Sequence, residues 1–259
     1  RITRGRFQFH EILRQYTNEK LNGQSDAVIS TQNNHCDFYT RFLEDQLEAL
    51  LGAGQQDALA EISMEIENIR ASWQWAVKHS LLDNLSRGMD TLFNYFYMLS
   101  WFREGHETFT QLINALSGDG ITTETRMVIG RARARQGWFT FLLGDHQSAR
   151  NLISQSMEEL QINGSQKDLT FCMNYLAAVF HGQGDYLAAK NLLEQSLEIS
   201  KNINDQYSLG VALNILGQIT AQLNDLQHAI EHLAEAMRIK QQIGDAWGAA
   251  FTLEYLGQI

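Results

Sequence analysis

The segments GDHQSA (144–149), GDYLAA (184–189) and NDLQHA (224–229) recur at a spacing of forty residues. Gly or Asn can end a helix in the left-handed conformation, and the Asp that follows can accept from the free N–H groups of the next helix. The closing alanine lets two helices approach closely, and an aliphatic side chain four residues on (Ile153, Leu193 or Leu233) shares its face. A helical repeat of this length predicts a solenoid of antiparallel helix pairs.

Composition supports long helices. The chain has 259 residues, 44% of them hydrophobic, and no proline. Cys36 and Cys172 have no partner motif, so we expect a reduced, cytoplasmic setting rather than a disulfide scaffold or zinc ribbon. No apolar run approaches the roughly 18 residues of a membrane helix, and no secretory signal opens the chain. Because it begins at Arg1 and stops within what aligns as another helix, we expect a piece of a longer protein.

Charge is distributed unevenly. Residues 1–20 carry five basic and two acidic side chains, a net charge of +3, while the whole chain carries −10. The remaining −13 repels phosphate backbones, because nucleic-acid affinity rests largely on cationic contacts. We therefore expect that the repeats do not bind nucleic acid, and that the basic start is an exposed, solvated terminus.

Before the repeats, the pattern predicts a short strand at 6–9, a helix over 10–21, and a polar linker or mobile loop at 22–34. Helices are expected at 35–51 and 57–79, followed by an aromatic helical hairpin at 84–116. Thr122 or Thr123 should cap the first regular helix. We divide the chain into 1–34, the end of a winged-helix-like unit and linker; 35–82, a helical adaptor; and 83–259, the repeat array.

The repeats resemble the tetratricopeptide family. Leucine followed by a small residue occupies the first helix at 176–177, 216–217 and 256–257, and the second helix carries small residues in two slots (Ala149, Ala189 and Ala229; Ser156, Ser196 and Ala236). The spacing exceeds the usual ~34 residues and is similar to the longer subclass found in bacterial regulators and kinesin light chain. The resemblance implies an all-α, right-handed superhelix. Arg133 and Gln136 depart from it by occupying apolar slots, so either the helix at 125–143 is rotated or its neighbour is unusual.

Two further stretches resemble STAND-type signalling ATPases, the class that includes the maltose-regulon activator. RFQFHEILRQY (6–16) is similar to the closing strand and helix of their winged-helix unit, and EIENIRASWQWA (65–76) to the helix that introduces their repeats. No Gly-rich phosphate-binding loop is present in the sequence. The resemblance therefore implies a nucleotide-binding module upstream of Arg1.

Catalytic patterns are weak. His228 and His232 are four residues apart on a helix and could share a metal ion with Asp225 or Glu231, but no third ligand has a convincing spacing. Two exposed histidines are the simpler interpretation. No Ser/His/Asp or Cys/His arrangement has a supporting motif. We predict no catalytic residue, no metal and no cofactor, with a metal-dependent hydrolase as a remote alternative.

The concave face of the array is the predicted binding site. Amides can pair with a peptide backbone, Arg offers a fork for a carboxylate or phosphate, and Trp gives a flat apolar wall. In the family, asparagines in this slot often hold peptide backbones; alternatively, they tie adjacent helices together. The candidate residues are Arg131, Arg135, Trp138, Phe171, Asn174, His181, Asn214 and Gln218.

These patterns together predict a regulatory arm of a larger transcriptional regulator. A peptide, protein or small-molecule inducer would bind the concave face and release an upstream ATPase. The alternative is a plain scaffold that docks a peptide. We expect no nucleic acid or membrane as a partner of the array. Self-association is expected through the open C-terminal end, which carries Tyr255, Leu256 and Ile259.

Overall fold

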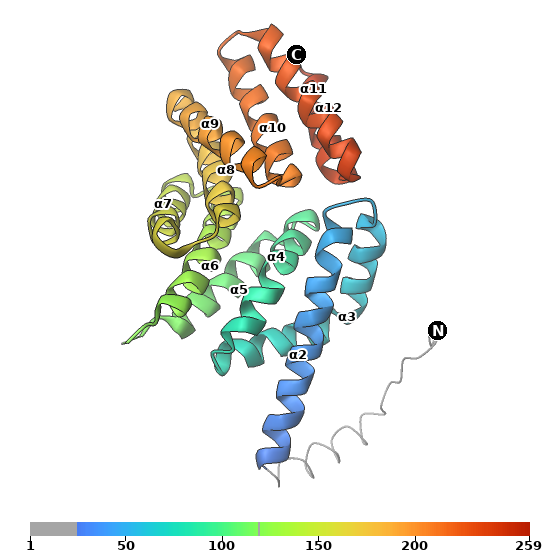
Figure 1. Cartoon of the computed structure of the whole chain (residues 1–259), viewed down its shortest axis with the longest axis vertical. Coiled ribbons are helices and arrows are strands. Elements are labelled where there is room, and N and C mark those ends of the chain that lie inside the picture. Colours follow the sequence, from blue (N-terminus) through green and yellow to red (C-terminus); the bar gives the residue numbers. More distant parts are fainter. Residues whose placement is uncertain (1–24, 119) are drawn as a thin grey trace.

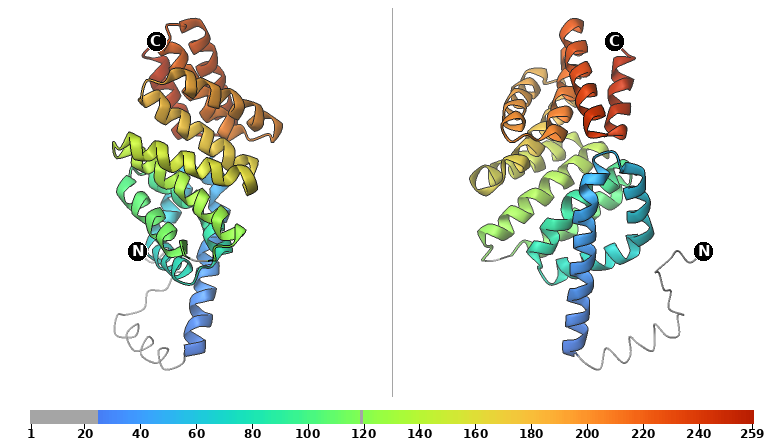
Figure 2. Two further views of the ribbon diagram at one scale, coloured as in Figure 1. Left: turned by 90° about the vertical axis from the view of Figure 1, so that its left-hand side faces the viewer. Right: turned by 45° about the vertical axis from the view of Figure 1, so that its right-hand side comes forward.

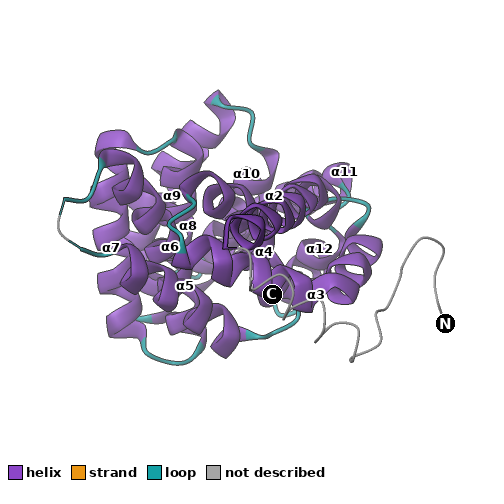
Figure 3. Cartoon of the chain, turned by 90° about the horizontal axis from the view of Figure 1, so that it is seen from below, coloured by secondary structure: helices purple, strands orange, loops and turns teal. Residues whose placement is uncertain are grey.

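A computed structural model of the chain describes residues 25–118 and 120–259. All of its regular elements are helices, which confirms the predicted all-α fold (Figure 3). The eleven helices of the described residues are α2 (Ser25–Leu50), α3 (Gln55–Lys78), α4 (Leu82–Met98), α5 (Phe102–Leu116), α6 (Thr123–Leu142), α7 (His146–Asn163), α8 (Gln166–Gly182), α9 (Tyr186–Asn202), α10 (Gln206–Gln222), α11 (Leu226–Ile243) and α12 (Ala246–Leu256).

The first part of the chain differs from the sequence prediction. The predicted strand at 6–9 and the helix at 10–21 lie outside the described residues. The linker predicted at 22–34 is wrong from residue 25 onward, because α2 begins at Ser25. Trp75 Nε1 on α3 donates to Asn33 Oδ1 at 2.9 Å, and the Ser72 hydroxyl lies 3.0 Å from His35 Nδ1. These two contacts hold the part of α2 around residues 33–35 against α3.

The repeat turns have the predicted geometry. Gly144, Gly184 and Asn224 have φ angles of 96°, 80° and 60°, and the aspartate after each one accepts from a backbone N–H of the next helix. Asp205 and Asp245 cap α10 and α12 in the same way, and Thr122 caps α6. The predicted small slots of the second helices are fully buried. Local capping and tight crossings thus define the repeat.

The two polar residues in apolar slots of α6 have partners on neighbouring helices. Gln136 Nε2 donates to Thr110 Oγ1 on α5 at 2.7 Å. Arg133 forms an ion pair with Glu159 on α7. Of the two explanations that the sequence offered, an unusual neighbour accounts for both positions.

The helix pairs stack into a curved array in which α2, α4, α6, α8, α10 and α12 contact one another in succession. Figures 1 and 2 show the array bending so that the loop between α2 and α3 meets the turn between α11 and α12. No helix of the described part is both long and apolar enough to cross a membrane.

We call the contact between residues 51–55 and residues 243–247 the clasp. Gln55 Nε2 donates to Asp245 Oδ1 at 2.9 Å, and Gln55 Oε1 accepts from Trp247 N at 2.9 Å. Gln55 and Asp245 are 6% and 3% exposed. Gly244 lies so close to the loop that an added Cβ would stand 2.6 Å from Ala53 N. The clasp therefore joins the first and last helices of the described array in a buried contact.

Candidate functional site

The inner side of the array contains a partly open pocket of about 320 Å³, which we call the chamber. Its walls come from α4, α6, α8, α10, α11 and α12. Its volume falls within the ~300–1,000 Å³ that is common for small-molecule sites. The lining residues are Tyr97, Trp138, Phe141, Leu142, Tyr175, Ala178, His181, Gly182, Tyr207, Val211, Asn214, Ile215, Gln218, Lys240, Asp245, Trp247, Gly248, Phe251 and Tyr255.

Aromatic rings make up much of the chamber wall. The ring centroids of Trp138 and Tyr175 are 4.5 Å apart. Tyr97 packs edge-on against Trp247 at 4.8 Å, which in turn contacts Phe251 at 4.5 Å. Rigid aromatic side chains provide apolar contact area at a low cost in conformational entropy. The chamber thus has apolar walls that a flat organic molecule could fill.

A polar group lies where α11 meets α12. Lys240 Nζ donates to Gly248 O at 3.1 Å and to Thr252 Oγ1 at 2.9 Å. Thr252 Oγ1 lies 2.8 Å from Asn214 Oδ1, to which it donates. Burial lowers the pKa of Lys240 to about 8, although the negative charge of Asp245 acts in the opposite direction. The ammonium is therefore retained at neutral pH.

His181 and the four phenols of the chamber favour their neutral forms. Burial lowers the pKa of His181. Burial raises the pKa of each of the four lining phenols. Asp245 accepts from Gln55 Nε2 and, at 2.8 Å, from Gly248 N. Formal charge in the chamber is thus confined to one lysine and one aspartate.

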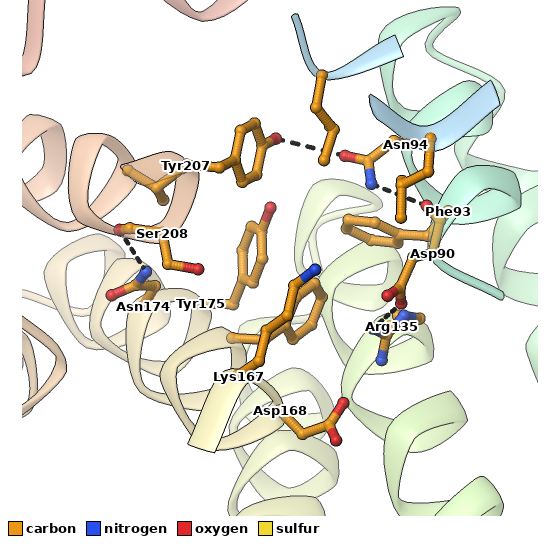
Figure 4. Close-up of a pocket in the computed structure, with 14 residues that line it drawn as sticks. Asp90, Phe93, Asn94, Arg135, Lys167, Asp168, Asn174, Tyr175, Tyr207 and Ser208 are labelled. Carbon is orange, nitrogen blue, oxygen red and sulfur yellow. Dashed lines mark hydrogen bonds and ion pairs between the residues drawn. The ribbon is translucent and has the colours of Figure 1, made fainter. Parts of the chain in front are cut away.

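A smaller cavity of about 50 Å³ adjoins the chamber and shares Tyr175, Tyr207 and Val211 with it. Figure 4 shows Tyr175 and Tyr207 side by side, with Arg135 and Asp90 across from them. The Tyr207 hydroxyl donates to Asn94 Oδ1 at 3.3 Å, which links α10 to α4 across the concave side.

A buried ion cluster lies beside this smaller cavity. Arg135 is 4% exposed and pairs with Asp90, and its guanidinium lies 4.4 Å from the ring centroid of Phe171. Arg131 pairs with Asp90 at 3.2 Å and with Asp168 at 3.0 Å. Burial alone would raise the pKa of Asp90, but the two guanidiniums outweigh it and lower the pKa to about 2. The forks of both arginines are therefore used within the protein.

Asn174 is 2% exposed and is bonded to two neighbouring helices. Its Nδ2 donates to Ser208 O on α10 at 3.0 Å, and its Oδ1 accepts from the Ser196 hydroxyl on α9 at 2.6 Å. These contacts favour the alternative in which this asparagine ties helices together. Asn214 occupies the same slot in the next repeat, but Ala236 stands there in place of Ser196. The Oδ1 of Asn214 accepts from the Thr252 hydroxyl instead.

The structure sorts the predicted site residues into three groups. Trp138, His181, Asn214 and Gln218 line the chamber. Arg135, Phe171 and Asn174 line the smaller cavity. Arg131 lines neither cavity and lies in the ion cluster. Whether any of them contacts a ligand stays a prediction.

Several residues of the chamber and the clasp are not among the candidates that the sequence pattern predicts. The burial of Lys240 could have been predicted from the sequence. The forty-residue spacing aligns it with Leu160 and Ser200 on the buried face of the second helix. A lysine is rarely buried in this way unless its ammonium has partners. Gln55 and Trp247 gave no such signal, since their contact joins positions far apart in the chain.

The histidine pair on α11 has a simple local environment. His228 Nδ1 lies 2.8 Å from Asp225 Oδ2 on the exposed surface. In the described ranges, no group of three or more His, Cys, Asp or Glu side chains could hold a metal ion. Cys36 and Cys172 are both free and buried.

Comparison with known proteins identifies the repeat. Residues 134–202 and 169–242 match the family described as tetratricopeptide repeat, which supports a tetratricopeptide repeat region in this part of the chain. Among solved structures, it is similar to the crystal structure of BtubC (BKLC) from P. vanneervenii, with 15% sequence identity and a TM-score of 0.56. The match covers 83% of this chain and 90% of that one, and it shows a shared fold. No curated protein matches the chain.

Proposed function

We propose that this chain is the ligand-sensing arm of a larger signalling protein and that the chamber is its binding site. The observation that carries the proposal is the clasp, which brings the adaptor helices α2 and α3 onto the far end of the repeat array. Repeat arrays of this kind typically bind partners on the concave surface. Here that surface contains a chamber of small-molecule size.

The geometry favours a small molecule over an extended peptide. A peptide needs a continuous open groove, whereas here the clasp and the Tyr207–Asn94 hydrogen bond cross the concave side. The chamber presents aromatic walls and a few convergent polar groups, which is the usual composition of a small-molecule site. A peptide-docking scaffold remains the alternative if the clasp opens in solution.

The clasp also provides a route for signalling. A ligand that contacts Trp247 and Asp245 would change the free energy of the contact with Gln55, because both residues belong to the chamber wall and to the clasp. Binding can shift a conformational equilibrium only through such differential contacts. By the STAND resemblance, the adaptor would pass this change to an upstream ATPase in a transcriptional regulator, in a cytoplasmic setting.

A fluorescent apolar probe, N-phenyl-1-naphthylamine, tests the chamber. Ala178 lines it, so Ala178→Trp should fill the space and abolish probe fluorescence. Ala234→Trp on the exposed side of α11 is the matched control and should bind the probe like the original protein. Equal binding by both variants would contradict the proposal. A Walker motif upstream of Arg1 in the parent protein would favour a sensor, and its absence would favour the scaffold.

A further inference from the structure

Lys240 is a buried cation whose hydrogen-bond partners are all neutral. Its side chain lines the chamber, and the residue is 4% exposed. Burying an ammonium is costly unless the charge is paired. Among the described residues, no carboxylate forms an ion pair with it. Because an ammonium has three donors and the protein uses two of them, one N–H stays available to a molecule in the chamber.

The nearby aspartate does not fill this role. Asp245 accepts from Gln55 Nε2 in the clasp and from the backbone of α12, which it caps. Its charge acts on Lys240 through space, but both neutral donors bind its Oδ1, and the two charged groups form no ion pair among the described residues. Lys240 therefore lacks a direct anionic partner, and it lines the same chamber as the aromatic side chains.

We infer that the molecule bound in the chamber is an aromatic or similarly flat organic acid whose carboxylate pairs with the Lys240 ammonium. The inference rests on the chamber being the binding site proposed above. One ammonium matches a singly charged acid. Dianionic phosphate groups are usually held by arginine forks or free helix N-termini, and here Arg131, Arg135 and the start of α12 are already engaged.

Displacement of N-phenyl-1-naphthylamine tests the inference. The competitors are 1-naphthaleneacetate and 1-naphthaleneacetamide, which have nearly the same shape and differ in charge. The acid should displace the probe at a concentration at least tenfold lower than the amide does. Lys240→Met should remove this difference, whereas the matched control Lys190→Met, at an exposed position of α9, should keep it.

A second variant and a pH series separate charge recognition from folding. Lys240→Arg keeps the charge and should keep the preference for the acid. In the original protein the preference should decline as pH rises through about 8, because burial lowers the pKa of Lys240 to that value. The other titratable groups facing the chamber are Asp245, His181 and the phenols of Tyr97, Tyr175, Tyr207 and Tyr255. In Lys240→Arg the decline should disappear.

The outcomes distinguish the two proposals. Equal displacement by acid and amide, or an undiminished preference for the acid in Lys240→Met, would overturn the carboxylate inference and leave the chamber as a binding site. If Lys240→Met does not fold, as judged by circular dichroism, a pH-independent preference in the original protein would overturn the inference. Failure of the probe itself to bind would overturn the proposed function.

Discussion

Gly244 offers a direct test of the clasp, because a matched glycine exists elsewhere in the array. Gly244 and Gly184 have φ angles of 81° and 80°. An added Cβ at Gly184 meets nothing within 4 Å, whereas at Gly244 it would lie 2.6 Å from Ala53 N and 2.8 Å from Ala53 Cβ. Substituting each with alanine therefore imposes the same backbone strain, and only one of the two substitutions disturbs the clasp.

The magnitudes follow from this comparison. Gly184→Ala should cost about 1 kcal/mol, the usual penalty for a left-handed non-glycine residue. Gly244→Ala should cost a further 1 to 3 kcal/mol or so, which is typical of overpacking. If the loop at 51–54 moves away to relieve the clash, the Gln55–Asp245 bond breaks. Adding Gln55→Ala to Gly244→Ala should then cost little more.

Unfolding free energies from urea denaturation, compared between the two variants, measure the difference. Hydrogen exchange at residues 51–55 should also become faster in Gly244→Ala and stay unchanged in Gly184→Ala. Surface substitutions usually change the free energy of unfolding by no more than about 0.5 kcal/mol. If the losses of the two variants agree to within about that amount, the clasp does not stabilise the fold as described.

Three further results are expected. Ala189→Leu should lower stability by about 1 to 3 kcal/mol, because the fully buried Ala189 sits in a tight helix crossing; an unchanged melting temperature would argue against that crossing. Asn174→Ala should cost about 1 to 3 kcal/mol, because it leaves the buried Ser196 hydroxyl without its acceptor, and adding Ser196→Ala should cost less than the sum; additive losses would contradict the network. The pKa of Asp90 is lowered to about 2 from an ordinary 3.8, so its contribution to folding stability is complete above pH 3.8 and is lost as the pH falls toward 2. In acid titrations of stability, Asp90→Asn should lack this loss. Identical pH profiles of the variant and the original protein would refute the role of Asp90.

Much of the repeat could be predicted because its signals are local. Gly184 and Asp185 define a turn and a cap through their own backbone chemistry, and Ala189 marks the crossing that follows. The same residue types at a constant spacing reveal the array. The concave face was also predicted, since the helix period places Trp138 and Asn214 on it.

Which side chains are free on the concave face depends on contacts between helices, and the forty-residue repeat pattern does not specify these contacts. Whether Asn174 points to solvent or to a neighbour depends on Ser196 and on the stacking of α10. The helix α2 extends back to Ser25 through residues that are polar and turn-rich, and its Asn33 accepts from Trp75 on α3, a contact between positions far apart in the chain. The chamber depends on the curvature of the whole array, which ends in the clasp between Gln55 and Asp245.

Hydrogen exchange with and without 1-naphthaleneacetate tests the central claim that the chamber senses a ligand and that the clasp reports its presence. The backbone N–H of Trp247, which donates to Gln55 in the clasp, and the amides of residues 51–55 should exchange more slowly when the acid is bound, because occupancy stabilises this contact. Unchanged exchange at both segments under saturating acid would contradict the account.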